Sequence, residues 1–214
     1  MTGALFISLK VLAVDVPLLF LIGTVLGWIF AKKRFPGHQI LLLLVLLPVA
    51  LPPSVLGFYL LLFVGQIPLL RSLGLLFSFP GAALGALIPS LPIIIQAARS
   101  GFAAVPEHLE EAARTLGDSE WRIFRRITLP LGRRSLVAGM ALSSARALGD
   151  FGVTLMIAGN IPGRTQTLPL YIYSRIEALE FAKAHIAAVV LVVVGILSLV
   201  LVRHMEVGTH ERLL

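Results

Sequence analysis

The chain has 214 residues, of which 57% are hydrophobic and 14% are charged, with a formal net charge of +7 and no cysteine. Soluble globular domains are about 45–50% apolar and about 25% charged, so this composition excludes a water-soluble enzyme, a disordered chain and a nucleic-acid-binding module. The lack of cysteine excludes disulfides, thiolate metal sites and cysteine nucleophiles. We expect no metal site in this chain.

Five hydrophobic segments are long enough to cross a lipid bilayer, which takes about 20 apolar residues. In chain order they cover about 4–30, 40–64, 79–98, 135–157 and 186–202. The predicted fold is an all-α integral membrane protein, with residues 1–214 forming a single transmembrane domain of five helices. The last segment is slightly short, so we expect Lys183 and Arg203 to reach the interface from its ends.

Prolines interrupt the second and third spans at Pro48, Pro52, Pro53, Pro89 and Pro92. A proline inside a helix removes a backbone hydrogen bond and kinks the axis. Carbonyls freed at membrane depth are tolerated only against protein or a water-filled cavity. Two interpretations remain open: kinked packing, or a translocation path lined by bent helices.

The basic residues are divided unevenly between the two sides of the predicted bundle. Twelve Lys and Arg lie in three segments: 31–39, 99–134 and 203–214. Four lie in the segments on the other side: 1–3, 65–78 and 158–185. Because cytoplasmic loops carry an excess of positive charge, we expect the N-terminus outside and the C-terminus in the cytoplasm of a multi-pass protein of the cell (inner) membrane.

The long cytoplasmic loop, 99–134, contains a predicted short helix that Pro106 starts and Gly117 ends. Its charges suit the helix dipole, with acidic residues first and the basic one last: Glu107, Glu110, Glu111 and Arg114. Its apolar residues form one strip: Leu109, Ala112, Ala113 and Leu116. A helix of this kind favours docking to a cytoplasmic partner protein. The alternatives are a self-packed hairpin or a helix lying on anionic lipid.

A second helix is predicted over about 119–128, with Asp118 or Ser119 as its N-cap and its end at Pro130. Its aromatic and apolar residues share one face, and its arginines lie on the others. The loop is therefore too helical to be a flexible linker.

The same loop resembles a known family signature. Glu111-Ala112-Ala113, three residues, Gly117, nine residues, Ile127, one residue and Leu129-Pro130 match EAA-x3-G-x9-I-x-LP of ABC importer permeases at every fixed position. The resemblance implies that this stretch is the coupling helix, which docks into a groove of the nucleotide-binding subunit. The implied docking residues are Glu107, Glu110, Glu111, Ala112, Ala113, Arg114 and Gly117.

Further stretches, 145–152, 158–169 and 46–57, resemble the molybdate/tungstate branch of that family, to which sulfate permeases are near relatives. One departure is Asp150, where the branch commonly has Glu. The resemblance implies a permease that moves molybdate or tungstate by alternating access. Its implied partners are two cytoplasmic ATP-binding subunits and an external or periplasmic oxyanion-binding protein. Five helices are few for enclosing a path, so a second copy of the chain is the expected partner within the bilayer.

Four ionisable residues lie inside the predicted spans: Lys10, Asp15, Arg146 and Asp150. A charged side chain at this depth has an unfavourable free energy of insertion, so it needs an ionic partner or water. Arg146 and Asp150 are one helical turn apart, so they form either a structural ion pair or part of the pore or gate.

The outer loop carries side chains that suit contact with a dianion: Asn160, Arg164, Thr165, Gln166 and Thr167. The alternative for this loop is a hydrogen-bonded turn at Pro162-Gly163.

No Walker A loop occurs, so ATP must be hydrolysed by a partner, and we expect this chain to carry no catalytic residue and no cofactor. A sulfate or thiosulfate permease is the nearest alternative. A secondary transporter or channel is less favoured, because the five histidines lie in loops or at a span boundary and form no proton relay. An intramembrane enzyme is disfavoured by the absence of H-E-x-x-H and G-x-S-x-G.

Overall fold

The structure is a computed structural model that describes residues 1–207, with side chains described as far as residue 200. The described part of the chain contains helices and no strands, which confirms the predicted fold class. Its helices are α1 (Thr2–Lys32), α2 (His38–Ala50), α3 (Pro53–Gln66), α4 (Pro68–Ser72), α5 (Phe79–Ala103), α6 (Glu107–Thr115), α7 (Glu120–Ile123), the π-helical turn η1 (Phe124–Thr128), α8 (Leu129–Leu148), α9 (Gly152–Ala158), α10 (Leu168–Glu177) and α11 (Phe181–Val207). The predicted end residue Arg203 lies outside the described side chains.

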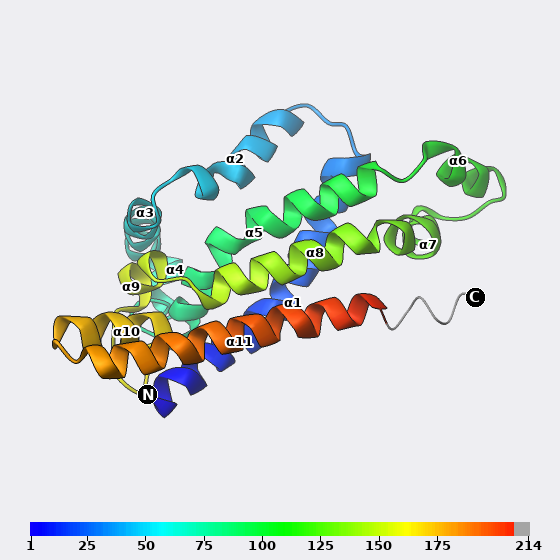
Figure 1. Ribbon diagram of the computed structural model, residues 1–214. Helices are drawn as coiled ribbons and strands as arrows, with labels where there is room; N and C mark the ends of the chain where they lie inside the picture. The colour runs from blue at the N-terminus through cyan, green and yellow to red at the C-terminus, as the bar shows by residue number, and fades with distance from the viewer. Residues whose placement is uncertain (208–214) are drawn as a thin grey trace.

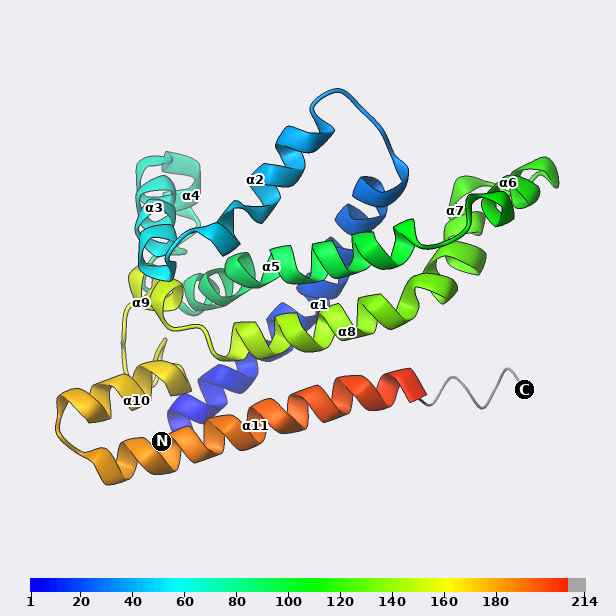
Figure 2. The ribbon, with the colours of Figure 1, turned by 45° about the horizontal axis from the view of Figure 1, so that its top comes forward.

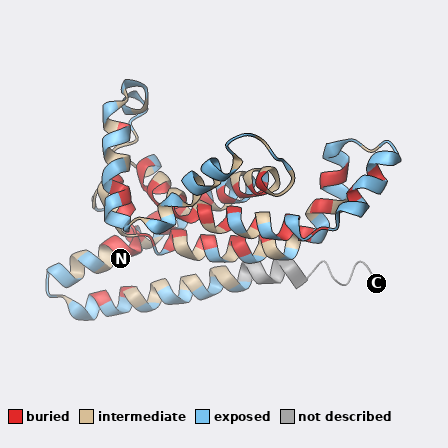
Figure 3. Ribbon diagram, turned by 90° about the horizontal axis from the view of Figure 1, so that it is seen from above, coloured by how far each residue is buried: buried red, intermediate tan, exposed pale blue. Residues whose placement is uncertain are grey.

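The long helices α1, α5, α8 and α11 run side by side and form the body of the molecule (Figures 1 and 2). α1 packs along α5, α5 along α8, and α8 against α11. Gly23 and Gly27 of α1 allow the first of these contacts, because a β-carbon there would collide with Ile94 and Ala98 of α5. Buried residues gather on α5 and α8, whereas α11 is largely exposed (Figure 3).

Three of the described helices are long and apolar enough to cross a membrane: Thr2–Lys32, Phe79–Ala103 and the Phe181–Val200 part of α11. They coincide with the first, third and fifth predicted spans. A fourth crossing is present if α2 and α3 count together as one broken span. α8 carries three arginines and is not among the candidates, so the count of five crossings stays a prediction.

The second predicted span, 40–64, is broken in the structure at two of the prolines that interrupt it, Pro52 and Pro53. The structure has α2 and α3 there, and their axes are bent by 118°. Leu51 and Pro52 each precede a proline, which disfavours helical backbone, and both are extended, with ψ of 140° and 136°. Pro53 then begins α3 at a position where its missing N–H is harmless. Pro89 and Pro92, by contrast, lie within the single helix α5.

The fourth predicted span, 135–157, is also divided in the structure. α8 starts earlier, at Leu129, and ends at Leu148, and the short helix α9 follows after Gly149–Phe151. The break is stabilised by Asp150, whose carboxylate accepts hydrogen bonds from the N–H and the hydroxyl of Thr154, each at 2.9 Å. A hydrophobic run alone therefore overstated the length of this helix.

The two ends of the bundle differ in what they carry. α6, α7 and η1 project from one end, towards which α11 also runs, while Met1 and α10 lie at the other end (Figure 1). The N-terminus and the predicted coupling helix thus lie at opposite ends, as the predicted topology requires.

Candidate functional site: the projecting end of the bundle

The predicted coupling helix is present as α6, and its C-terminal end is the one the sequence predicts. Gly117 has a φ of +86°, a conformation that glycine adopts without strain. The N–H groups of Gly117 and Asp118 donate to the carbonyls of Arg114 and Ala113, both at 3.0 Å. These are the two bonds of a Schellman cap. Pro106, predicted as the first helical residue, is instead the N-cap, with a ψ of 127°.

The second predicted helix, 119–128, does not end at Pro130. Ser119 precedes α7, which spans only one turn, and the chain then continues through η1 directly into α8. Pro130 lies in the first turn of α8 and follows η1 directly, so the helix continues through it. Single π-helical turns inside longer helices occur often at functional sites.

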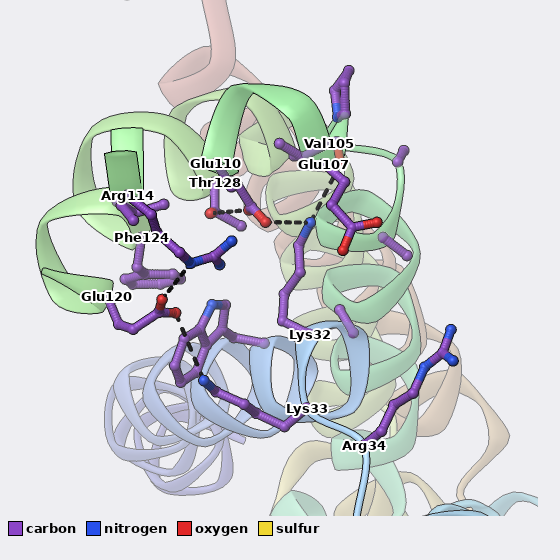
Figure 4. Close-up of a pocket in the computed structure, with 16 residues that line it drawn as sticks. Lys32, Lys33, Arg34, Val105, Glu107, Glu110, Arg114, Glu120, Phe124 and Thr128 are labelled. Carbon is purple, nitrogen blue, oxygen red and sulfur yellow. Dashed lines mark hydrogen bonds and ion pairs between the residues drawn. The ribbon is translucent and has the colours of Figure 1, made fainter. Parts of the chain in front are cut away.

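Glu110 is the centre of a buried polar cluster that joins three parts of the chain (Figure 4). Its Oε2 lies 3.0 Å from Nζ of Lys32, the last residue of α1, and its Oε1 accepts a 2.6 Å hydrogen bond from the hydroxyl of Thr128. Lys32 also donates to the carbonyl of Val105, at 3.3 Å. We call Lys32, Glu110 and Thr128 the Glu110 cluster. The side chain of Glu110 is 4% exposed, so this predicted docking residue faces the molecule's interior.

A cavity of about 850 Å³ lies between the end of α1 and the α6–η1 segment, and both the Glu110 cluster and a second, exposed set of charges line it (Figure 4). Nε of Arg114 lies 2.6 Å from Oε1 of Glu120, and Nζ of Lys33 lies 3.6 Å from Oε2 of the same residue. The hydrogen bond from Arg114 lowers the pKa of the Glu120 carboxyl, and the same hydrogen bond raises the pKa of the Arg114 guanidinium. All three side chains are close to half exposed, so water screens these pairs.

The outer face of α6 is left uncovered by the chain itself. Of the predicted docking residues, five are exposed: Glu107, Glu111, Ala112, Arg114 and Gly117. Ala113 faces inward with Glu110, because residues three apart share one face of a helix. The predicted apolar strip is mostly exposed, with Leu116 at 87%, and Trp121 of α7 is 69% exposed. Large apolar side chains exposed on a projecting segment are typical of a protein-binding surface.

Within the predicted spans, Arg146 and Asp150 form the expected ion pair, with 2.9 Å between Nη1 and Oδ1. The pair lies within one chain, and its carboxylate also binds Thr154 at the break before α9. Lys10 lies over the rings of Phe6 and Phe79. Asp15 is buried, and its carboxylate oxygens have no hydrogen-bond partner among the described residues.

The outer loop uses most of its polar side chains internally. Nε2 of Gln166 donates to Oδ1 of Asn160 at 2.8 Å, and Nδ2 of Asn160 donates to the hydroxyl of Ser174 at 2.6 Å. The hydroxyl of Thr165 accepts from the N–H of Ile161. Thr165, Gln166 and Thr167 are buried, whereas Arg164 is exposed. The geometry is that of the hydrogen-bonded turn, and of the five predicted anion contacts only Arg164 faces solvent freely.

Sequence reasoning missed two residues of the projecting end, Lys32 and Thr128. Lys32 contributes to the sequence pattern only as a loop charge, and Thr128 is a variable position of the EAA signature. Their partners lie far away in sequence: Lys32 and Val105 are separated by 73 positions, and Thr128 and Glu110 by 18. No local pattern of residues signals such pairs.

Comparisons with known proteins agree with one another. The sequence profile of the family "Binding-protein-dependent transport system inner membrane component" matches residues 23–209. The molybdenum transport system permease protein ModB of Azotobacter vinelandii is 36% identical over 190 residues, which is 86% of this chain and 84% of that protein. The sulfate transport system permease protein CysW of Synechococcus elongatus is 34% identical over 215 residues, covering 98% and 75% of the two chains.

Among solved structures, a bacterial ABC transporter involved in the import of the acidic polysaccharide alginate has a similar chain. The TM-score is 0.80 with 15% sequence identity, over 97% of this chain and 79% of that one. At this identity the similarity shows the fold alone.

Proposed function

The chain belongs to the family of binding-protein-dependent transport system inner membrane components, and we propose that its substrate is molybdate or tungstate. It is a multi-pass membrane permease subunit of an ABC importer. Members of the family do not carry the catalytic machinery themselves, and the family implies ATP-binding subunits and a substrate-binding protein as partners. We further propose that two copies of the chain enclose the path across the lipid bilayer.

The observation that carries the proposal is the exposed face of α6 at one end of the bundle. A capped helix with Glu111 and Ala112 uncovered offers a partner a narrow, charged surface that enters a groove closely. We propose that this surface docks the ATP-binding subunit, with Glu107, Arg114 and Gly117 around it. This end then lies in the cytoplasm and the N-terminus outside, which the twelve-to-four division of basic residues supports.

The similarity to ModB of Azotobacter vinelandii supports molybdate or tungstate as the substrate. Sulfate or thiosulfate is the second candidate, because the similarity to CysW of Synechococcus elongatus covers 98% of this chain. Molybdate, tungstate and sulfate are all tetrahedral dianions, so one weakly charged path suits them all. Arg146 is about one-third exposed and is paired with Asp150, so the pair offers a dianion only weak attraction.

Transport in this proposal proceeds by alternating access. ATP binding to the partner favours one state of the permease dimer over the other, and the differential binding energy shifts the population. The dimer opens outward, receives the anion from the external binding protein, and then opens inward. A path without a high-affinity anion site suits this cycle, because a tightly bound dianion would not be released to the inside.

Uptake by reconstituted vesicles tests the proposal. The permease, the ATP-binding subunit and the external binding protein are combined, and radiolabelled molybdate uptake is followed with and without ATP. We expect uptake only with ATP, competition by tungstate, and little competition by sulfate. ATP-driven sulfate uptake without competition by molybdate would favour the sulfate alternative. Uptake without the ATP-binding subunit would instead indicate a secondary transporter or channel.

A further inference from the structure

The Glu110 cluster joins parts of the chain that move separately if the coupling helix is displaced. α6 projects away from the bundle, and the helices it packs against are α7 and η1 (Figure 2). Lys32 ends α1, which packs along α5 through most of its length, and Thr128 is the last residue of η1 before α8. The cluster is therefore a direct connection from α6 to the end of α1 and to the start of α8.

We propose that the Glu110 cluster is the mechanical link that carries displacement of α6 to α1 and α8, with Glu110 as its positioning residue. The inference rests on the proposed function, in which α6 is the helix that the ATP-binding subunit moves. It gives Glu110 a role distinct from docking, since its carboxylate faces the permease interior and binds no partner surface.

The chemistry of the cluster suits a rigid link. A buried ion pair strongly resists losing one partner, because the remaining charge is left in a region of low dielectric. Both oxygens of the Glu110 carboxylate are engaged, one by Lys32 and the other by Thr128. Thr128 is 1% exposed, so water does not compete for its hydroxyl. The carboxylate is therefore fixed from two sides.

The π-helical turn explains why a link to Thr128 matters. η1 lies between α7 and α8, and its π-helical turn interrupts the regular α-helical hydrogen bonding between them. A displacement of α6 that passed only along the chain would be absorbed in η1. The hydrogen bond from Thr128 to Glu110 spans this turn and carries the displacement directly to the start of α8.

The pair Lys33–Glu120 provides a matched control. It joins the same end of α1 to the same loop, but its atoms are 3.6 Å apart and both side chains are nearly half exposed. Water and salt screen such a pair, so it transmits little force.

The test measures the number of anions transported per ATP hydrolysed in vesicles containing the complete transporter. For Lys32→Met and for Glu110→Gln we expect normal binding of the ATP-binding subunit and ATP hydrolysis within about twofold of wild type, while the ratio falls about tenfold. In the double variant this ratio falls no further than in either single variant, because both changes break the same link. Lys32→Arg retains the ratio, and Lys33→Met, which removes the matched exposed pair, changes it by less than about twofold.

A second measurement does not depend on the identity of the anion. The chain has no cysteine, so Leu21→Cys on the exposed face of α1 carries a single spin label. We expect ATP to change the label's spectrum in the otherwise wild-type transporter and to leave it unchanged when Glu110→Gln is added. A retained spectral change, an unchanged transport ratio, or loss of subunit assembly as the sole defect would each overturn the proposal. ATP-driven uptake of sulfate in place of molybdate would overturn only the proposed substrate and leave these two readouts valid.

Discussion

The two ends of the molecule differ in how far their predicted contact residues are covered. At the projecting end, Glu111 of α6 is exposed, as are Leu116 after it and Trp121 of α7. At the other end, Asn160 and Gln166 bind each other, and the neighbouring threonines are buried. Both segments resemble binding sites in the sequence. The difference shows that a polar loop is available to a ligand only when its own chain leaves its donors and acceptors unsatisfied.

Two buried carboxylates, Asp150 and Glu110, stabilise the fold over different distances in sequence. Asp150 binds Arg146 and Thr154, each four positions away, and so fixes a local break between helices. Glu110 binds Lys32 and Thr128, which belong to other segments. Asp150 is therefore expected to affect mainly stability, and Glu110 mainly communication between segments.

The largest effect is expected from Asp150→Ala. The change leaves the guanidinium of Arg146 and the N–H of Thr154 without their partner. Because Arg146 is about one-third exposed, we expect a cost of about 2 kcal/mol, below that of a fully buried ion pair. The free energy of unfolding in detergent measures it. The control Arg71→Ala removes an exposed arginine and is expected to cost less than about 0.5 kcal/mol. A cost below 1 kcal/mol for Asp150→Ala, on the order of one hydrogen bond, would contradict the structural role given to this carboxylate.

Glu111→Lys tests the exposed face of α6. Reversing a charge that faces a partner should lower ATP-driven uptake by about tenfold, while the stability of the isolated permease stays within about 0.5 kcal/mol. Uptake and binding of the ATP-binding subunit measure the effect. His108→Lys adds positive charge to the same helix outside the EAA signature and serves as the control. Wild-type uptake and subunit binding in Glu111→Lys would refute the docking role.

A smaller effect is expected from Gln166→Ala in the outer loop. The change leaves Oδ1 of Asn160 without its donor and should destabilise the permease by about 1 kcal/mol. The anion concentration that gives half-maximal uptake should not change, because the side chain is engaged in the turn. The comparison between the two ends fails if that concentration rises severalfold while stability is unchanged. Arg164→Ala, which removes the exposed arginine of the loop, is the matched variant.

The smallest effect is expected from the Arg114–Glu120 pair. The pKa of Glu120 is lowered in the folded state by its bond to Arg114, so the pair stabilises above the unfolded pKa of about 4.3 and is lost as the pH falls through the folded value. Because both side chains are nearly half exposed, Glu120→Gln should cost less than about 0.5 kcal/mol at neutral pH. The melting temperatures of the wild-type protein and of Glu120→Gln, measured at neutral and at acidic pH, check this. A difference in melting temperature that persists in strong acid would contradict a contribution from this ion pair.

Local features of this protein were predictable because they depend on neighbouring residues. The spans that became α1, α5 and α11 follow from long, predominantly apolar runs. The end of α6 follows from Gly117, and the Arg146–Asp150 pair follows from the four-residue spacing of the two side chains. The EAA signature, whose spacing is fixed along the chain, indicates where α6 lies within the loop.

The sequence by itself thus determined the all-helical class, the family and the position of the projecting helix, since periodicity, capping and signature spacing are short-range properties. Only the tertiary structure decided the 118° bend between α2 and α3, the break at Asp150 and the internal bonds of the outer loop. It also decided that Glu110 turns inward to Lys32 while Glu111, its neighbour, stays exposed. The physical reason is that a side chain's partners depend on which distant segments the packed helices bring beside it.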